Sequence, residues 1–447
     1  EAVRHDHVGI QGDRLKELLR PSLPLMAAAL AATVNQFVDR LFLGHVSDVA
    51  LEAITPVTVL TTVFSCVFLE VIAYSGTFVA QYSGRRRHGW AVRALAQGVW
   101  LAVATVPLIL AIVPVGNFTL ERLGHAAELV QAERTYFDIV FPSFAFVCFS
   151  TALGAYFTAV RRAGLVGGAQ IASCLANMLF DALLVPRFGM AGAAWSSVLA
   201  AILPCLILGA ALVRRRRAFR ALDAPDLALL ARIVRFALPN AATSFAAAAA
   251  FFFFVWATGR VSPLALAVSN VCFCVNCFYY TLTSGLGNGV TALVGRFRGS
   301  GDDIEVRQTI HRALLLDGTL FVAMAILFAV CGGDLADLFR GETSSFAPAR
   351  FHAVGTALFR IVILANVFET LQVTFCAALR GVGDTRYVMK ATLVAECVCW
   401  IPLVVLVLAV RPDITLLWWT IVVWHALCAA LLFRRWRSGV WQRIRLI

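Results

Sequence analysis

Apolar stretches of about 20 residues recur along the whole chain, and this feature restricts the possible folds more than any other. Each stretch is long enough to cross a hydrocarbon layer about 30 Å thick. Because backbone polar groups in lipid must be satisfied internally, stretches of this length indicate helices. Only 14% of the 447 residues are charged, against about 25% in soluble domains. The sequence therefore predicts an all-α integral membrane protein.

The apolar stretches predict twelve transmembrane helices in two groups of six. Their approximate ranges are 21–45, 54–83, 90–114, 131–159, 165–187, 191–213, 235–258, 264–295, 307–332, 351–379, 387–410 and 413–434. A polar stretch that begins with four arginines separates the sixth from the seventh. We accordingly expect an N-terminal segment, a first lobe, an inter-lobe linker, a second lobe and a basic tail, at residues 1–20, 21–213, 214–234, 235–434 and 435–447.

The formal charge of +12 is distributed unevenly along the chain. Of the 38 Lys and Arg residues, 29 fall in the two terminal segments and in alternate loops. By the positive-inside rule these segments face the cytoplasm, which places both termini there and requires an even number of spans. The distribution of the basic residues therefore indicates how the chain is oriented in the membrane, and no nucleic-acid partner is expected. Since the basic residues are mostly Arg, we expect a bacterial protein of the cytoplasmic (inner) membrane.

An internal repeat relates the two halves of the chain. The pairs at an offset of 215 are Gly44-His-Val-Ser-Asp-Val-Ala-Leu51 with Gly259-Arg-Val-Ser-Pro-Leu-Ala-Leu266, Pro24 with Pro239, and Gly84 with Gly299. Residues 159–164 match 378–383 at an offset of 219. Because each half holds six spans, the halves share one orientation, and we expect a pseudo-two-fold axis along the membrane normal. Secondary transporters place substrate between such lobes, although duplication could also produce a structural scaffold.

Several motifs resemble those of the multidrug and toxic-compound extrusion family of transporters. Arg380-Gly-Val-Gly-Asp-Thr-Arg386 is similar to the loop after the tenth helix of that family. Phe37-Val-Asp-Arg-Leu-Phe-Leu-Gly44 resembles its first-helix Asp-Thr-x-x-x-Gly. Asn177-Met-Leu-Phe-Asp181 and Phe188-Gly-Met-Ala-Gly-Ala-Ala194 are similar to its fifth-helix Asn-x-x-x-Asp and to the start of its sixth helix. The resemblance covers nearly the whole chain in the expected order.

This resemblance implies an antiporter that exports small organic compounds, cationic or amphiphilic, while H⁺ or Na⁺ enters. It also implies two lobes that rock between outward-facing and inward-facing states. Two features depart from the family pattern. Glu70 stands in the second helix where the family has small or polar residues, and residues 246–254 of the seventh helix lack the acid that some members carry there. The second departure argues against a cation site on the seventh helix.

Carboxylates inside membrane spans are costly unless they are paired or hydrated, so each is a candidate functional group. Asp39 and Asp181 lie five residues before the outer ends of their helices, which corresponds to a depth of about 7–8 Å. Asn35 and Asn177 precede them by four residues, on the same helical faces. We expect the four side chains to converge in one oxygen-rich pocket of the first lobe.

Such a pocket suits a hard cation such as Na⁺, held by Asp39, Asn177 and Asp181. It equally suits two coupled carboxylates that exchange a proton. Ser197 would add a hydroxyl group, and the resemblance places Tyr136 where the family has a fourth-helix Tyr near its cation pocket. The alternative is that Asp39 pairs with an Arg near the membrane interface and has no role in coupling.

Other acids lie near the middle of their predicted spans. Glu369 resembles a tenth-helix acid that some family members use for Na⁺. Glu369 and Glu396 either form a second proton or substrate site or stay neutral as hydrogen-bonded packing groups. Glu70 either attracts a cationic substrate or is a neutral acid bonded to a neighbour, and Asp317 is a weaker candidate of the same kind.

Enzyme signatures are missing from the sequence. It contains no Gly-x-Ser-x-Gly, no His-Glu-x-x-His and no phosphate-binding Gly-rich loop with Lys. We therefore expect a transporter and not an enzyme, without an organic cofactor, with H⁺ or Na⁺ as coupling ion, and monomeric in the lipid bilayer. The alternatives are a flippase for a lipid-linked intermediate, which requires a basic cavity, and an intramembrane enzyme.

Overall fold

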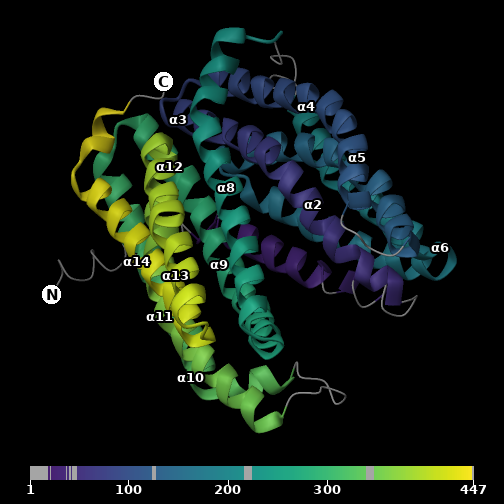
Figure 1. Cartoon of the computed structure of the whole chain (residues 1–447). Helices are drawn as coiled ribbons and strands as arrows, with labels where there is room; N and C mark the ends of the chain where they lie inside the picture. The colour runs from purple at the N-terminus through teal and green to yellow at the C-terminus, as the bar shows by residue number, and fades with distance from the viewer. Residues whose placement is uncertain are drawn as a thin grey trace. The chain divides into compact units, whose positions relative to one another are not determined.

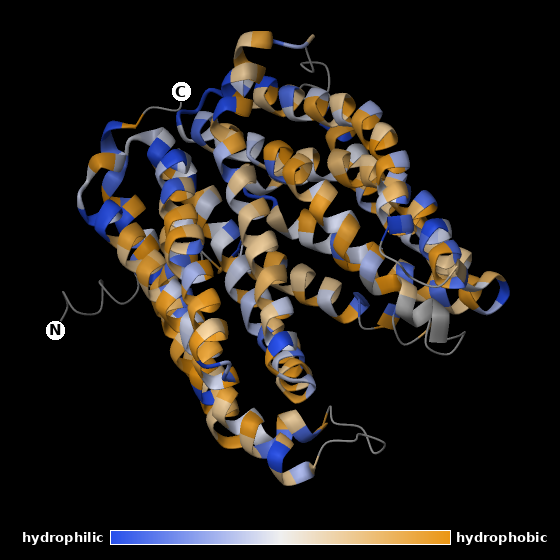
Figure 2. Cartoon of the chain, in the orientation of Figure 1, coloured by the Kyte–Doolittle hydropathy of each residue, from blue (hydrophilic) through white to orange (hydrophobic). Residues whose placement is uncertain are grey.

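The computed structural model describes residues 19–20, 22–36, 38–39, 42, 48–122, 127–215, 224–338 and 347–444. Within these ranges the regular secondary structure is helical, and ten helices are long and apolar enough to cross a membrane. Figure 2 shows hydrophobic residues along these helices, with hydrophilic residues near several of their ends. The predicted all-helical class is therefore confirmed, whereas the count of twelve spans stays a prediction.

The chain divides into two compact units. Unit 1 comprises the described residues up to Ala241 together with Gly295–Asp302, and unit 2 comprises Ala242–Val294 together with the described residues from Asp303 on. Helices α8 (Leu227–Val261) and α9 (Pro263–Ser300) contribute to both units. Most of the predicted N-terminal segment, the middle of the predicted linker and the last three residues lie outside the described residues. The predicted lobe limits stay a prediction.

Unit 1 begins with helical residues 22–36, which belong to the predicted first span. Its labelled helices (Figure 1) are α2 (Asp48–Ala73), α3 (Ser75–Gly84), α4 (His88–Arg122), α5 (Ala127–Ala159) and α6 (Ala163–Arg214). Helices α2 and α3 together form the predicted second span, with an interruption at Tyr74. The Tyr74 amide still donates to the Glu70 carbonyl oxygen at 3.1 Å, so the direction of the chain is kept.

Helix α6 holds the predicted fifth and sixth spans, joined by a sharp bend. Gly189 has φ 56° and ψ −130°, a backbone conformation that residues with a Cβ rarely adopt. Beyond the bend, a Cβ on Gly192 would lie 2.3 Å from the Leu184 carbonyl oxygen. The Ser173 hydroxyl donates to the Ala200 carbonyl at 2.7 Å, from one arm to the other. The two arms therefore run back along each other.

The ends of α3 and α9 pack against each other within unit 1 through two glycines. A Cβ on Gly84 would lie 2.0 Å from the Arg296 carbonyl oxygen, and a Cβ on Gly299 would lie 2.0 Å from the Gln81 carbonyl oxygen. Gly84 and Gly299 are partners in the repeat at offset 215, and so are Gln81 and Arg296. The contact is reciprocal, as at an interface around a local two-fold axis.

Unit 2 contains the remaining parts of α8 and α9 and the C-terminal helices. These are α10 (Asp303–Leu338), α11 (Pro348–Val382), α12 (Thr385–Leu393), the π-helix η1 (Val394–Trp400), α13 (Ile401–Val410), α14 (Ile414–Arg437) and the short 3₁₀ helix η2 (Val440–Arg443). The predicted eleventh span thus contains a π-helical segment that the sequence pattern did not indicate. Pro402 is the second residue after this segment, and its nitrogen has no hydrogen to donate to the helix ladder.

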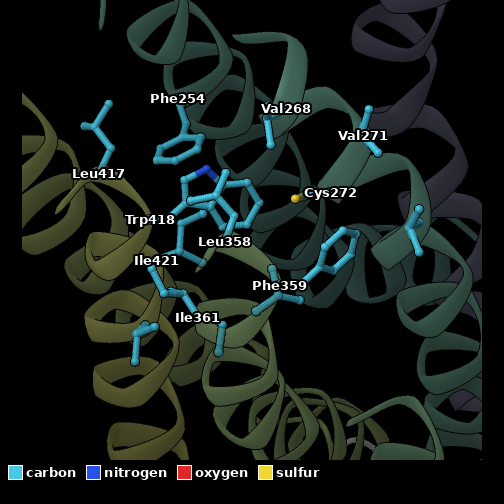
Figure 3. Packing of buried hydrophobic residues seen from close by; sticks show 14 of the residues in the cluster. Phe254, Val268, Val271, Cys272, Leu358, Phe359, Ile361, Leu417, Trp418 and Ile421 are labelled. Carbon is cyan, nitrogen blue, oxygen red and sulfur yellow. The ribbon is translucent and has the colours of Figure 1, made fainter. Parts of the chain in front are cut away.

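The core of unit 2 is a cluster of aromatic and aliphatic side chains from α8, α9, α10, α11, η1, α13 and α14, part of which Figure 3 shows. Phe254 is 0% exposed and meets Trp418 edge-on, with 6.0 Å between ring centroids. Phe273 stacks on the same Trp418 at 4.7 Å. The four neighbouring phenylalanines of α8 therefore do not share one role, since Phe254 packs inside while Phe252 is 64% exposed.

Candidate functional site

Asp181 is a buried carboxyl group in the first arm of α6, with 1% of its surface exposed. The Ser196 hydroxyl on the second arm donates to Asp181 Oδ1. The Asn177 amide, one turn earlier, donates to Asp181 Oδ2 at 3.0 Å. The bend at Gly189 sets Ser196 opposite Asp181, so one helical hairpin supplies all three polar side chains.

Asn35 connects this cluster to the first helix. Its Nδ2 atom donates to Asn177 Oδ1 at 3.0 Å and lies 3.3 and 3.4 Å from the two carboxyl oxygens of Asp39. Asn35 and Asp39 share a helical face because they are four residues apart. The structure therefore places Asn35, Asp39, Asn177 and Asp181 together, as the sequence predicts, while their role in coupling stays a prediction.

The carboxyl groups of Asp39 and Asp181 are hydrogen-bond neighbours. An ionised carboxylate has no hydrogen to donate, and two like charges at this separation repel each other. A proton shared between the two groups, or a cation between them, removes that repulsion. The compact arrangement of Asp39 and Asp181 is therefore compatible with a bound proton or ion and unfavourable without one.

Tyr136 of α5 and Ser197 border the two acids. The Tyr136 side chain is 7% exposed, lies close to Asp39 and Asp181, and hydrogen-bonds the Ser197 side chain. The Ser197 hydroxyl also donates to the Ala193 carbonyl at 3.1 Å. Ser197 thus contacts the cluster through Tyr136, and the hydroxyl bound to Asp181 is that of the preceding residue.

The oxygen atoms of this cluster have the chemistry that a hard cation prefers. Asn35 Oδ1 is buried and accepts no hydrogen bond, and an unsatisfied buried acceptor costs about 1–3 kcal/mol. The carboxyl groups of Asp39 and Asp181 supply negative charge beside it. The residues present therefore fit Na⁺ as well as a proton.

The internal repeat provides an independent view of this geometry. The repeat partner of Asp39 is Phe254, and that of Asp181 is Trp400. In unit 2 these two rings stack on each other, with centroids 5.5 Å apart and an interplanar angle of 23°. The same pair of positions thus meets in both halves, as two acids in unit 1 and as two aromatic rings in unit 2.

Glu369 of α11 belongs to a different polar cluster, in unit 2. Asn276 of α9 hydrogen-bonds its carboxyl group, and Asp317 of α10 lies close to it. Asp317 Oδ2 in turn accepts a hydrogen bond from Thr374 at 2.8 Å. Three helices therefore bring two further acids together, a combination that the sequence did not predict.

Glu396 lies in the π-helix η1 and is 0% exposed. Both of its carboxyl oxygens lack a hydrogen-bond partner. Its side chain is near Cys428 of α14, on a side of the unit that also holds Arg380. Within the described part of the chain no hydrogen bond or ion pair joins Glu396 to Glu369. The two acids therefore have different neighbours in the structure, and their role as a second site stays a prediction.

Glu70 lies in the last turn of α2 and accepts a hydrogen bond from the Asn240 side chain of α8. Both residues belong to unit 1. Asn240 is 5% exposed, and Glu70 is half-buried. The structure thus gives Glu70 a polar neighbour inside the protein, and its part in substrate binding stays a prediction.

Sequence reasoning missed Ser196, Asn240 and Asn276 as partners of the acids. For Ser196 a signal existed, because residues at similar distances before and after the bend at Gly189 face each other. For Asn240 and Asn276 no such signal existed, because their contacts depend on which distant helices become neighbours.

The MatE family model matches two segments of the chain, residues 24–183 and 239–406. The starting residues of these segments differ by 215, which is the offset of the internal repeat.

Two relatives are multidrug resistance proteins by name. The chain is 26% identical over 391 residues to the "Probable multidrug resistance protein NorM" of Deinococcus radiodurans, with 85% of each chain covered. It is 25% identical over 404 residues to the "Multidrug resistance protein PmpM" of Pseudomonas aeruginosa, with 85% of this chain and 81% of that protein covered. The crystal structure of a MATE protein in complex with MaL6 has a TM-score of 0.87 at 16% identity, covering 96% of this chain and 98% of the other. This last similarity concerns the fold alone.

Proposed function

The chain belongs to the MatE family, and from this premise we propose that it is a secondary active transporter that exports small organic compounds in exchange for H⁺ or Na⁺. The two named relatives are multidrug resistance proteins, which supports export of small organic compounds and argues against an enzyme; we propose that these compounds are cationic or amphiphilic. A flippase for a lipid-linked intermediate gains no support, since the acids Asp39, Asp181 and Glu70 would repel a phosphate.

The contact between Asp39 and Asp181 carries this proposal. A bound proton or cation allows the two carboxyl groups to stay together, and its release makes them repel each other. The first helix and α6 are then driven toward a different arrangement. A substrate that binds one arrangement better than the other becomes coupled to the ion. One charge that moves through 100 mV supplies about 2.3 kcal/mol, which is a concentration factor of roughly fifty.

The same cluster would serve either coupling ion. Na⁺ would be held by Asp39, Asn177 and Asp181, with the unpartnered carbonyl oxygen of Asn35 as a further ligand. A proton would need only the two carboxyl groups. Tyr136 and Ser197 would position the cluster in both cases.

We extend the proposal to the arrangement in the membrane. It comprises twelve helices in two six-helix lobes, 21–213 and 235–434, related by a pseudo-two-fold axis along the membrane normal. The segments 1–20, 214–234 and 435–447 would face the cytoplasm of a bacterium, with the chain monomeric in the inner membrane. The alternation of basic loops supports this topology, and the reciprocal glycine contact of α3 and α9 supports the axis.

Transport by the purified protein in liposomes tests the function. Ethidium movement would be followed with a pH gradient at equal Na⁺, and separately with a Na⁺ gradient at equal pH. We expect movement against the ethidium gradient under at least one condition. We also expect added ethidium to dissipate that ion gradient faster than in protein-free liposomes. Ethidium movement that is only downhill under both conditions would contradict the proposal.

A further inference from the structure

We propose that Glu70 and Asn240 form a binding site for a protonated amine of the transported substrate. This inference rests on the proposed function and deepens it, because it names the chemical group that the transporter recognises. It concerns a second polar position of unit 1, built from α2 and α8 and separate in sequence from the residues around Asp181.

One acceptor atom of this pair, on Asn240, has no donor in the structure. The Asn240 amide nitrogen donates to Glu70 Oε2. This bond leaves Asn240 Oδ1 as a buried acceptor without a hydrogen-bond partner, on a side chain that is 5% exposed. A carboxylate and an amide carbonyl side by side both accept hydrogen bonds. A ligand group that carries positive charge and N–H hydrogens can donate to Asn240 Oδ1 and is attracted by the charge of the neighbouring Glu70.

Both residues lie next to backbone irregularities. Glu70 is fourteen residues before Gly84, the end of α3, and Asn240 is thirteen residues after Leu227, the start of α8. At 1.5 Å per residue each is about 20 Å from that helix end. Secondary transporters often bind substrate at interrupted helices.

The irregularities themselves are a turn and a proline. Helix α2 stops at Ala73, and the chain passes through Tyr74 before α3 begins. Pro239 directly precedes Asn240 and removes one hydrogen bond from the ladder of α8. The hydrogen-bond ladder of α8 is therefore one bond short next to Asn240.

Two aromatic rings lie one turn from the polar pair, and a third ring packs against both of them. Tyr74 follows Glu70 by four residues, and Phe236 precedes Asn240 by four. Phe78 packs edge-on against both rings, at 6.3 Å from Tyr74 and 6.2 Å from Phe236 between centroids. Aromatic faces attract organic cations and bury their apolar parts.

The chemistry of the pair favours an organic amine over a metal ion. A hard cation takes about six to eight oxygen ligands in proteins, and the two side chains offer far fewer. Among the described groups around Glu70, the Cys66 thiol one turn away on α2 is a titratable neighbour, and a thiol is a poor ligand for Na⁺. An ammonium group needs only the charge of Glu70 and one or two acceptors.

The test measures equilibrium binding of two fluorescent probes to the purified full-length chain in detergent. Dansylcadaverine carries a protonated primary amine, and its trimethylammonium analogue carries the same charge without N–H hydrogens. In Glu70→Gln we expect both probes to bind at least about tenfold more weakly. In Asn240→Leu we expect the primary amine to lose several-fold more affinity than the trimethylammonium analogue.

Glu121→Gln is the matched control, because Glu121 is an exposed acid paired with Arg134 on the surface. It is expected to bind both probes like the wild type. A neutral dansyl amide tests for a structural effect, since it should not respond to Glu70→Gln. Unchanged binding of both cations in Glu70→Gln would overturn the inference, and so would an equal loss for the neutral amide. Where Glu70→Gln fails to fold, the two-probe comparison in Asn240→Leu decides alone, and equal losses would refute the site.

This measurement needs no ion gradient, so its failure is distinguishable from failure of the proposed function. Gradient-driven ethidium transport together with unchanged probe binding in Glu70→Gln would refute only the amine site. Probe binding that responds as expected, without any gradient-driven transport, would refute the transport proposal.

Discussion

Ser196 and Asn35 illustrate how individual polar atoms define the buried cluster of unit 1. The Ser196 hydroxyl donates to one oxygen of Asp181 and the Asn177 amide to the other. Asn35 donates toward Asp39 and Asn177 through its nitrogen, while its own carbonyl oxygen has no partner. The cluster therefore contains a buried acceptor that has neither a hydrogen-bond donor nor a cation. An ion-exchanging site requires such an acceptor for its ion.

Replacement of Ser196 by Ala removes the hydroxyl donor of Asp181 and is expected to slow transport about tenfold. The physical reason is that loss of a donor to a buried acidic group costs about 1–3 kcal/mol. Ser173→Ala is the matched control, because Ser173 lies in the same hairpin and donates to the Ala200 backbone carbonyl instead. Initial transport rates in liposomes check this. Equal rates for Ser196→Ala and Ser173→Ala would contradict the assigned role of Ser196.

Glu396 also has buried acceptors without a partner, and both oxygens of its carboxyl group are in this state. Replacement by Met removes an unsatisfied polar group at similar volume, so we expect the thermal midpoint to rise. Glu369→Met is expected to lower it, because Asn276 then loses its acceptor. Thermal unfolding in detergent measures both changes. A lower midpoint for Glu396→Met would show that Glu396 has a stabilising partner.

At the residue scale, sequence predicted the acids of unit 1 and failed on several of their partners. Asp39 and Asp181 stand out because charge is rare in apolar spans, and Asn35 and Asn177 follow from helical spacing. Ser196 is an ordinary serine in a small-residue segment, and only the bend of α6 makes it a ligand of Asp181. Its neighbour Ser197 was predicted in that place, one residue away on the helix.

At the scale of elements, the hairpin of α6 positions most of the cluster. Gly189 provides the positive φ that turns the chain back, and Gly192 permits the second arm to lie against the backbone of Leu184. Asn177, Asp181 and Ser196 then face one another. The packing of the two arms of α6 thus brings the Asn177–Asp181 motif and Ser196 together in one polar cluster.

Replacement of Gly192 by Ala is expected to separate the two arms, because its Cβ would lie 2.3 Å from a backbone oxygen. Overpacking of this kind costs about 1–3 kcal/mol, so both the thermal midpoint and the transport rate should fall. Gly209→Ala is the matched control in the same arm, since nothing lies within 4 Å of its added Cβ. A midpoint for Gly192→Ala equal to that of Gly209→Ala would contradict the assigned contact.

The positions of the elements could be predicted from apolar length, and their irregularities could not. The ten described spans all overlap predicted ones, because hydrophobic length alone determines where a helix crosses lipid. The interruption at Tyr74 and the π-helix at Val394–Trp400 left no clear pattern. Such features arise from local hydrogen bonding and packing, which apolar periodicity does not report.

At the scale of the whole molecule, the two halves share a plan and differ in chemistry. The positions that bring Asp39 and Asp181 together in unit 1 bring Phe254 and Trp400 together in unit 2. The repeat could be predicted from the sequence, including the absence of this acid pair from the second half. The matching positions of the two halves thus carry different chemistry, with ion exchange proposed for unit 1 and an aromatic core in unit 2.

The reciprocal glycine contact of α3 and α9 predicts symmetric mutational effects. Gly84→Ala and Gly299→Ala should each lower the thermal midpoint by a similar amount, because each Cβ would lie 2.0 Å from the partner backbone. The double variant should lower the thermal midpoint by less than the sum of the two single decreases, since either substitution already separates the same two helix ends. Gly318→Ala, with nothing within 4 Å of its Cβ, is the control. Strictly additive losses would contradict a single shared contact.

The central claim is that Asp39 and Asp181 exchange one ion against substrate as a unit. Its most direct test is the ion flux released by adding substrate to loaded liposomes, measured for Asp39→Asn, Asp181→Asn and the double variant. The account predicts that each single variant loses this flux and that the double variant is no worse. Asp138→Asn, an exposed acid bonded to Asn117, should keep it. An ion flux on substrate addition that equals the wild-type flux, in either single variant, would contradict the claim.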